Sequence, residues 1–306
     1  MTLQNLHAHT RYDDGSDTPR AMVEAALAAG MPSVGISLHS PLPFQNGWAA
    51  KPERVAAFYR EMRARRGEYA GRIDVYAGLE WDILSGVEML LGSGAATDGQ
   101  ALPGGCPKAA GEDVPHDSGN TCLLADGCDY VIGSVHYILF DGARCAVDKS
   151  ADTTRAWLRD VFGGDVDEAA RRYFAQVGSL AYAEQVDVVG HFDLLTKFDE
   201  QEHFFDASRL AYRTAARSAM ERLCAAGKIF EINTGAISRG YRTTPYPSRE
   251  LLCELARMGG RVTVSADAHR AQDIAYGLED AAALARACGF RELWFLQNKA
   301  FIPVRL

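Results

Sequence analysis

Residues 130–136 read Tyr-Val-Ile-Gly-Ser-Val-His, an apolar run that ends in a histidine. Its length and its Val/Ile content are typical of a buried β-strand. The same arrangement, an apolar run that leads to histidine or an acidic residue, recurs at residues 5–9, 34–39, 75–80, 188–191 and 262–269. These segments carry six of the eight histidines. If strand ends cover about a tenth of the chain, chance would place about one histidine there.

Helix patterns lie between the predicted strands. Thr18-Pro19 is an N-cap and first-turn pair that opens an alanine-rich helix over residues 20–29, and Gly30 ends it. A helix also opens near Pro52. Further helices are predicted at 166–183, 208–226, 248–258 and 281–288, with strands at 186–189, 228–232 and 261–265. Residues 292–295 form a final apolar run.

Alternating strands and helices favour a parallel sheet covered by helices. Metal-binding residue types at the ends of many strands favour closure of this sheet into a barrel, where the chemistry sits at the carboxyl ends of the strands. An open doubly wound sheet would instead gather its site at one crevice. The sequence therefore predicts a single α/β barrel domain over residues 1–306.

One long stretch breaks this alternation. Residues 85–127 are rich in Gly, Ala, Asp and Pro and show no helix or strand period. Irregular segments of this length are unusual in compact domains and often act as lids or binding loops. Because the stretch directly follows the strand that ends at Glu80, we predict an active-site lid. The alternative is a surface insertion without a catalytic role.

Composition limits the class of partner. The net charge of −8 and the pI near 5.5 disfavour nonspecific binding to nucleic acid or to an anionic membrane. No apolar stretch reaches the length of a membrane span, and no signal segment precedes His7. The sequence thus predicts a cytoplasmic protein and leaves its oligomeric state open.

The seven cysteines are scattered and contain no C-x-x-C pair, so a disulfide framework is not expected. Cys106, Cys122, Cys128 and Cys145 lie near His116 and offer an alternative, a structural zinc site. Their long, uneven spacings favour unpaired thiols.

The histidines and carboxylates at the strand ends suit borderline divalent ions such as zinc, iron and manganese. His7 and His9 are two residues apart on an extended chain, so their side chains point the same way and can bind one ion together. The full predicted ligand set is His7, His9, Asp14, His39, Glu80, His136, His191, Asp267 and His269.

With these residues the chain resembles the polymerase and histidinol phosphatase (PHP) family of metal-dependent phosphoesterases, and within it the histidinol-phosphatase branch. The resemblance covers nearly the whole length. It rests on matching motifs in the same order: His7-Ala-His-Thr10, Asp14-Gly15, Gly78-Leu-Glu80, Asp129-Tyr-Val-Ile-Gly-Ser-Val-His136, Asp187-Val-Val-Gly-His191-Phe-Asp-Leu, Glu231-Ile-Asn-Thr, Tyr246-Pro-Ser and Ala266-Asp-Ala-His269.

The resemblance implies a distorted (β/α)7 barrel that holds three divalent ions. It assigns one ion to His7, His9, Glu80 and Asp267, a second to Glu80, His136 and His191, and a third to Asp14, His39 and His269. Two features depart from the family pattern. Leu38 stands where the family has an acidic residue before its second-motif histidine, and the insertion after Glu80 is longer than usual.

The implied activity is the hydrolysis of L-histidinol phosphate, a small phosphorylated metabolite of histidine biosynthesis, by a metal-bound hydroxide. Glu80 would bridge two ions, and either Asp267 or His269 would pass a proton to the leaving alkoxide. Arginine suits phosphate because its planar fork binds two oxygens. The candidates are Arg239, Arg242 and Arg270, and Arg239 matches the family's substrate-side position most nearly.

Two other functions remain open at this stage. One is a phosphodiesterase or nuclease of the same metal class, although the acidic chain lacks basic-aromatic stretches. The other is a noncatalytic module that keeps the barrel and has lost its metals. The complete set of ligand residues argues against such a module.

Overall fold

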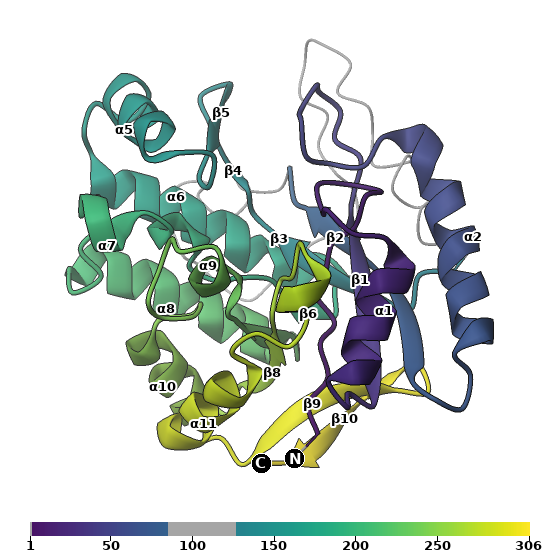
Figure 1. Cartoon of the computed structure of the whole chain (residues 1–306). Helices are drawn as coiled ribbons and strands as arrows, with labels where there is room; N and C mark the ends of the chain where they lie inside the picture. Colours follow the sequence, from purple (N-terminus) through teal and green to yellow (C-terminus); the bar gives the residue numbers. More distant parts are fainter. Residues whose placement is uncertain (1, 85–126) are drawn as a thin grey trace.

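The structure, a computed structural model, describes residues 2–84 and 127–306. Its main sheet has six parallel strands in the order β1-β2-β3-β6-β7-β8 and curls around the centre of the molecule (Figure 1). These strands are β1 (Ser33–His39), β2 (Asp74–Asp82), β3 (Tyr130–Ser134), β6 (Val188–Val189), β7 (Ile229–Asn233) and β8 (Arg261–Ser265). The sequence prediction of a parallel α/β sheet is confirmed.

The N-terminal segment lies between the two edge strands of this sheet. Asn5 forms a parallel bridge to Val34 of β1, and Ala8 forms one to Ala268, just after β8. The sheet is therefore linked across its open side by the residues that also carry His7 and His9.

The strand predicted to end at His7 is present only as these two isolated bridges. The reason is the side chain of Asn5, whose Oδ1 accepts hydrogen bonds from the backbone N–H groups of His7 at 3.0 Å and Ala266 at 3.1 Å. A side chain thus takes part in the hydrogen bonding that a regular strand would leave to its backbone.

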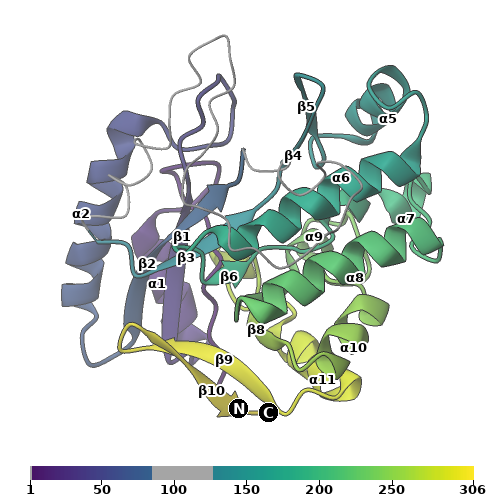
Figure 2. The ribbon, with the colours of Figure 1, turned by 180° about the vertical axis from the view of Figure 1, so that it is seen from behind.

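Helices flank the sheet on both sides (Figures 1 and 2). One flank holds α1 (Pro19–Ala28) and α2 (Pro52–Glu68), and the other holds α6 (Val166–Ser179), α8 (Leu210–Ala225), α10 (Arg249–Arg257) and α11 (Leu278–Cys288). The predicted start of α1 is confirmed, because Thr18 accepts a hydrogen bond from the N–H of Ala21 at 3.2 Å. α6 ends four residues earlier than predicted, in the 3-10 turn η1 (Leu180–Tyr182).

Several elements were missing from the sequence prediction. β4 (Tyr137–Phe140) and β5 (Ala143–Ala146) form an antiparallel hairpin after β3, followed by α5 (Ala151–Asp160). The other short elements are η2 (Leu194–Thr196), α7 (Asp199–Glu202), α9 (Gly235–Ser238) and η3 (Ala271–Asp273). The hairpin, α5 and the loop between β1 and α2 lie at one end of the molecule (Figure 1).

The final apolar run, residues 292–295, is a strand that lies outside the main sheet. It is part of β9 (Glu292–Gln297), which pairs with β10 (Ala300–Arg305) as a separate antiparallel hairpin beside both termini (Figure 1). Asn298 and Lys299 have φ values of 49° and 65°, the positive angles of a tight two-residue hairpin turn. Such a turn returns the chain antiparallel at once, so no crossover helix can follow β9.

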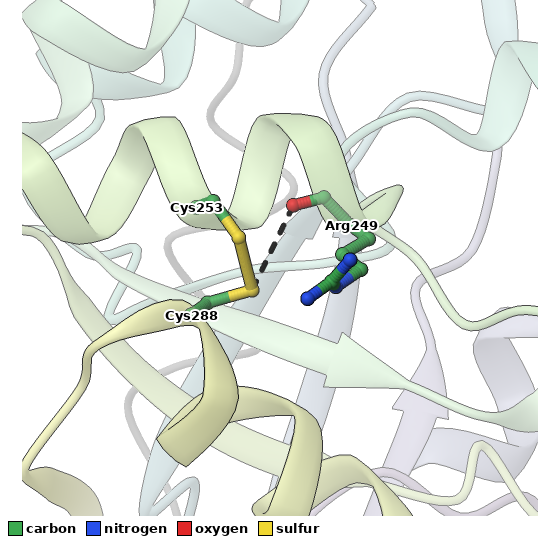
Figure 3. The surroundings of a disulfide bond; sticks show 3 residues. All are labelled: Arg249, Cys253 and Cys288. Carbon is green, nitrogen blue, oxygen red and sulfur yellow. Dashed lines mark hydrogen bonds between the residues drawn. A yellow bond between two sulfur atoms is a disulfide. The ribbon is translucent and has the colours of Figure 1, made fainter.

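One pair of cysteines departs from the prediction of unpaired thiols. Cys253 of α10 and Cys288, the last residue of α11, form a disulfide with Cα atoms 4.5 Å apart (Figure 3). The packing of α10 against α11 brings together residues 35 positions apart, a proximity that no spacing rule reveals. Cys128, Cys145 and Cys224 are free thiols. Cys106, Cys122 and His116 of the alternative zinc site lie outside the described residues.

Replacing Cys253 by serine is expected to lower the free energy of unfolding by about 2–4 kcal/mol, because an unfolded chain without the 35-residue loop has more conformations. Urea unfolding of oxidised protein measures this loss. Cys224→Ser, at a half-buried free thiol, is the matched control. An equal loss in fully reduced protein would contradict the role of the disulfide.

The predicted lid, residues 85–127, lies outside the described residues except for Gly127. Within the described part of the chain, no helix is both long and apolar enough to cross a membrane.

Candidate metal centre

The predicted ligands meet at the carboxyl ends of the parallel strands. His39 ends β1, and its register partner on β2 is Glu80. His136 and His191 follow β3 and β6, and the pair Asp267 and His269 follows β8. Parallel strands end at one edge of a sheet, so this shared position brings together residues far apart in the sequence.

Glu80 lies at the centre of this cluster and is 1% exposed. Its Oε2 faces three histidine nitrogens: His7 Nε2 at 3.1 Å, His9 Nε2 at 3.3 Å and His39 Nδ1 at 3.0 Å. Its Oε1 faces two others: His191 Nε2 at 3.0 Å and His136 Nε2 at 3.6 Å. The two oxygens of one carboxylate thus face two different histidine groups.

A third group gathers around Asp14. Its Oδ1 lies 3.7 Å from His39 Nε2, and its Oδ2 lies 3.4 Å from His269 Nε2. Among the described residues, four sets of side chains offer ligand atoms within 4.8 Å of one another: His7, His9 and Asp267; Glu80, His136 and His191; His9, His39 and His269; His9, Asp13, Asp14 and His39. All nine predicted ligands belong to one or more of these sets.

Several ring nitrogens and one carboxylate oxygen in the cluster are buried without a hydrogen-bond partner in the described part of the chain. They are His7 Nε2, His9 Nε2, His39 Nδ1, His191 Nδ1 and Glu80 Oε2. A buried polar atom without a partner carries a desolvation cost that a bound cation would offset. The donor set and these inward-facing atoms therefore fit divalent metal ions.

Residues beyond the predicted ligands orient their rings. His7 Nδ1 lies 2.8 Å from Glu231 Oε2, and His9 Nδ1 lies 3.0 Å from Asp13 Oδ2. An N–H donated to a carboxylate at Nδ1 leaves Nε2 free to bind a metal. Glu231 also accepts a hydrogen bond from the backbone N–H of His191 at 2.7 Å, so it connects two ligands.

The ring of His136 follows the same principle, because both carboxylate oxygens of Asp82 lie 3.0 Å from His136 Nδ1. His269 differs: its Nδ1 lies 2.8 Å from Arg239 Nη1, which can only donate, so Nδ1 accepts this hydrogen bond. Asp13 and Glu231 had no role in the predicted site. Asp82 had a detectable signal, since it lies two residues after Glu80 and shares its side of the strand.

The cluster strongly shifts its own protonation equilibria. Burial lowers the pKa of His9, but Asp13 and Asp267 raise it to about 10. Burial likewise lowers the pKa of His136, but Asp82 raises it to about 10. For Glu80, burial raises the pKa, while His39 and His7 hold it well below its usual range. The metal-free cluster therefore pairs protonated histidines with ionised carboxylates.

The three predicted substrate arginines differ in position. Arg239 donates hydrogen bonds to the Asp267 carbonyl at 2.8 Å and to Asp267 Oδ2 at 3.0 Å, and 27% of its side chain is exposed. Arg242 is buried, donates to Thr244 Oγ1 at 3.2 Å and lies over the Tyr246 ring. No hydrogen bond or ion pair among the described residues joins Arg242 to a predicted ligand.

Arg270 pairs with Asp273 at 2.8 Å, and 49% of its side chain is exposed. Among the described residues it likewise has no ion pair with a predicted ligand. His203 is exposed at the end of α7, away from the predicted ligands in the sequence and without an ion pair to them among the described residues. Asp193, two residues after His191, is buried and accepts a hydrogen bond from Ser248 N–H at 2.9 Å.

The parallel sheet and the cluster of histidines and carboxylates at its strand ends agree with one known family. The chain belongs to the PHP domain family, whose profile matches residues 5–235. It is 28% identical over 303 residues to a protein of Deinococcus radiodurans named as a probable histidinol-phosphatase, covering 97% of this chain and 98% of that one. It is 23% identical over 298 residues to the histidinol-phosphatase of Bacillus subtilis, covering 91% and 98%.

A solved structure supports the fold. The histidinol phosphate phosphatase of Lactococcus lactis, crystallised with zinc, L-histidinol and phosphate, superimposes with a TM-score of 0.71 at 20% identity. The match covers 98% of this chain and 99% of that chain. The two proteins therefore share one fold over almost their full lengths.

Proposed function

We propose that this protein is a metal-dependent phosphomonoesterase that hydrolyses L-histidinol phosphate to L-histidinol and phosphate in histidine biosynthesis. The observation that carries the proposal is the convergence of all nine predicted ligands around Glu80. The Deinococcus and Bacillus relatives carry the name histidinol-phosphatase, and the Lactococcus structure holds zinc, L-histidinol and phosphate. A phosphodiesterase or nuclease has no comparable support among these relatives.

We assign three divalent ions, zinc, iron or manganese, to the three groups. The first belongs to His7, His9, Glu80 and Asp267; the second to Glu80, His136 and His191; the third to Asp14, His39 and His269. When bound, such ions activate water and balance the negative charge of a phosphate ester. Glu80 belongs to two of these groups because its two carboxylate oxygens face different histidines.

Asp267 fits the role of a ligand better than that of a proton donor. Burial raises its pKa, but Arg239 and His7 hold it well below its usual range, so the carboxylate stays ionised. His269 is the other candidate donor to the leaving alkoxide. Its side chain remains 23% exposed, and it would donate only while its Nε2 binds no metal.

The finer architecture is also a proposal. The bridges of the N-terminal segment to β1 and to the residues after β8 support a distorted (β/α)7 barrel, with the N-terminal segment as the seventh strand. Cytoplasmic location and the absence of a nucleic-acid partner also remain predictions.

Rates of hydrolysis test the proposed function. Purified protein loaded with zinc, manganese or iron is expected to release phosphate from L-histidinol phosphate much faster than it cleaves a dinucleotide. Equal rates on L-histidinol phosphate and on the dinucleotide would contradict the assignment of L-histidinol phosphate as the substrate. A chain that binds less than about one ion would favour the noncatalytic alternative.

Replacing Arg239 by alanine is expected to reduce kcat/KM about 10–100-fold, because a hydrogen bond to a charged group contributes about 1.5–3 kcal/mol. Arg239→Lys keeps the charge and is expected to lose less. Initial rates at several substrate concentrations separate KM from kcat. Arg270→Ala, at an arginine paired with Asp273, is the control. A larger loss of kcat/KM in Arg270→Ala than in Arg239→Ala would indicate that Arg270, not Arg239, binds the phosphate.

A further inference from the structure

His39 is held differently from most of the other predicted ligands. Three of the six ligand histidines, His7, His9 and His136, have Nδ1 within 3.0 Å of a carboxylate oxygen, and His269 Nδ1 accepts a hydrogen bond from Arg239 at 2.8 Å. In His39, Nδ1 faces Glu80 Oε2 at 3.0 Å and Nε2 faces Asp14 Oδ1 at 3.7 Å. Both nitrogens thus point into the metal centre, and no hydrogen bond to a described residue outside the centre fixes the ring.

Two aromatic planes enclose the His39 ring instead. His9 stacks on it with a centroid distance of 4.1 Å and an angle of 13°. Trp48 meets it edge to face at 4.6 Å and 75°, and the same indole lies 5.0 Å from the ring of His136. Trp48 therefore contacts ligands assigned to two different ions.

The loop between β1 and α2 returns Trp48 to the end of its own strand. The N–H of Ala50 donates to the carbonyl of His39 at 3.3 Å, which closes the loop. Asn46 Oδ1 accepts hydrogen bonds from the N–H groups of Trp48 at 3.1 Å and Ala49 at 2.7 Å. These bonds fix the backbone that carries the indole.

The indole itself is fixed from a second element. Trp48 Nε1 donates a hydrogen bond to the hydroxyl of Tyr137 on β4 at 3.3 Å, and the two rings are nearly parallel, at 18°. An aromatic ring held at both its backbone and its polar atom is a rigid wall for the ring beside it.

We propose that Trp48 is a positioning residue that holds the His39 ring for the third ion, in place of an outer hydrogen bond. The proposal rests on the metal centre of the proposed function. Groups that orient metal ligands contribute about 10–100-fold to metal affinity when they are hydrogen-bond partners. We expect an aromatic ring that restrains the histidine in place of such a partner to contribute a similar factor to metal affinity.

Metal binding tests the proposal without an activity assay. Trp48→Leu is expected to weaken the binding of one ion about 10–100-fold in chelator competition, and to lower the metal count after dialysis by about one ion. Trp48→Phe keeps an aromatic plane and is expected to restore most of the affinity. Trp294→Leu, at a half-buried tryptophan on β9, is the matched control and is expected to bind as the wild type does.

Comparison with His39→Ala identifies the ion concerned, because both variants should lose the same one. Asn46→Ala releases the loop while keeping the indole, so it repeats the test if Trp48→Leu does not fold. Unchanged affinity in Trp48→Leu, with three ions bound by the wild type, would overturn the role of Trp48 alone. A wild-type chain that binds no ion would instead overturn the proposed centre.

Discussion

Replacing Glu80 by glutamine is expected to remove two of the three ions and to reduce kcat at least about 1000-fold. The reason is that Oε2 faces His7, His9 and His39 while Oε1 faces His136 and His191. An amide has the same shape but offers no charge and presents N–H groups on one side. Charge stabilisation by metal ions is worth several kcal/mol, and each 1.4 kcal/mol is about tenfold in rate.

Metal analysis of the purified variant and steady-state rates on L-histidinol phosphate measure both losses. Glu61→Gln makes the same chemical change at a carboxylate that accepts a hydrogen bond from Tyr12 at 2.8 Å, and serves as the control. Retention of three ions by Glu80→Gln would show that Glu80 does not bridge two metal groups.

The affinity for metal is expected to rise steeply with pH. His9 and His136 each have a pKa of about 10 in the metal-free chain, so both carry a proton at pH 7. A metal ion binds only the unprotonated nitrogen and must displace that proton. Burial lowers the pKa of His7, but Glu231 and Glu80 raise it well above its usual range, so His7 releases a third proton. With three protons released, the overall association constant should rise about 1000-fold per pH unit, and the rise should level off above the histidine pKa values.

Calorimetry in buffers of different ionisation enthalpy measures the number of protons released at each pH. His9→Ala removes one of these protons, and its slope should fall accordingly. Metal affinity rises with pH because the pKa values of His9 and His136 are raised. Lowering the pH protonates these rings again and releases the metal. An association constant that does not change between pH 6 and pH 8 would contradict this account.

The sequence alone predicted the site residues more completely than the elements of the fold. Predicted ligands such as His136 and His191 follow apolar runs. The carboxyl ends of parallel strands lie at one edge of a sheet, so residues just after such runs are expected to lie close together. The orienting groups were harder to find, because Glu231 and Asp13 act through register and loop geometry. Whether Glu231 reaches His7 depends on a contact between residues 224 positions apart.

The elements missed by the sequence share a physical cause. The hairpin of β4 and β5 is short and half-exposed, so its residues show neither a long apolar run nor a clean alternation. The pairing of Cys253 with Cys288 depends on how two helices pack, and spacing along the chain does not encode it. The position of Trp48 depends in the same way on the closure of a loop by Ala50.

The link between the N-terminal segment and the residues after β8 also orders events during synthesis. Asn5 accepts a hydrogen bond from Ala266, a partner 261 positions later in the chain. His7 and His9 thus leave the ribosome well before Asp267, and their surroundings are complete only when Asp267 has followed. Contacts of such long separation form slowly, so we expect nascent chains that end before Asp267 to lack the finished centre.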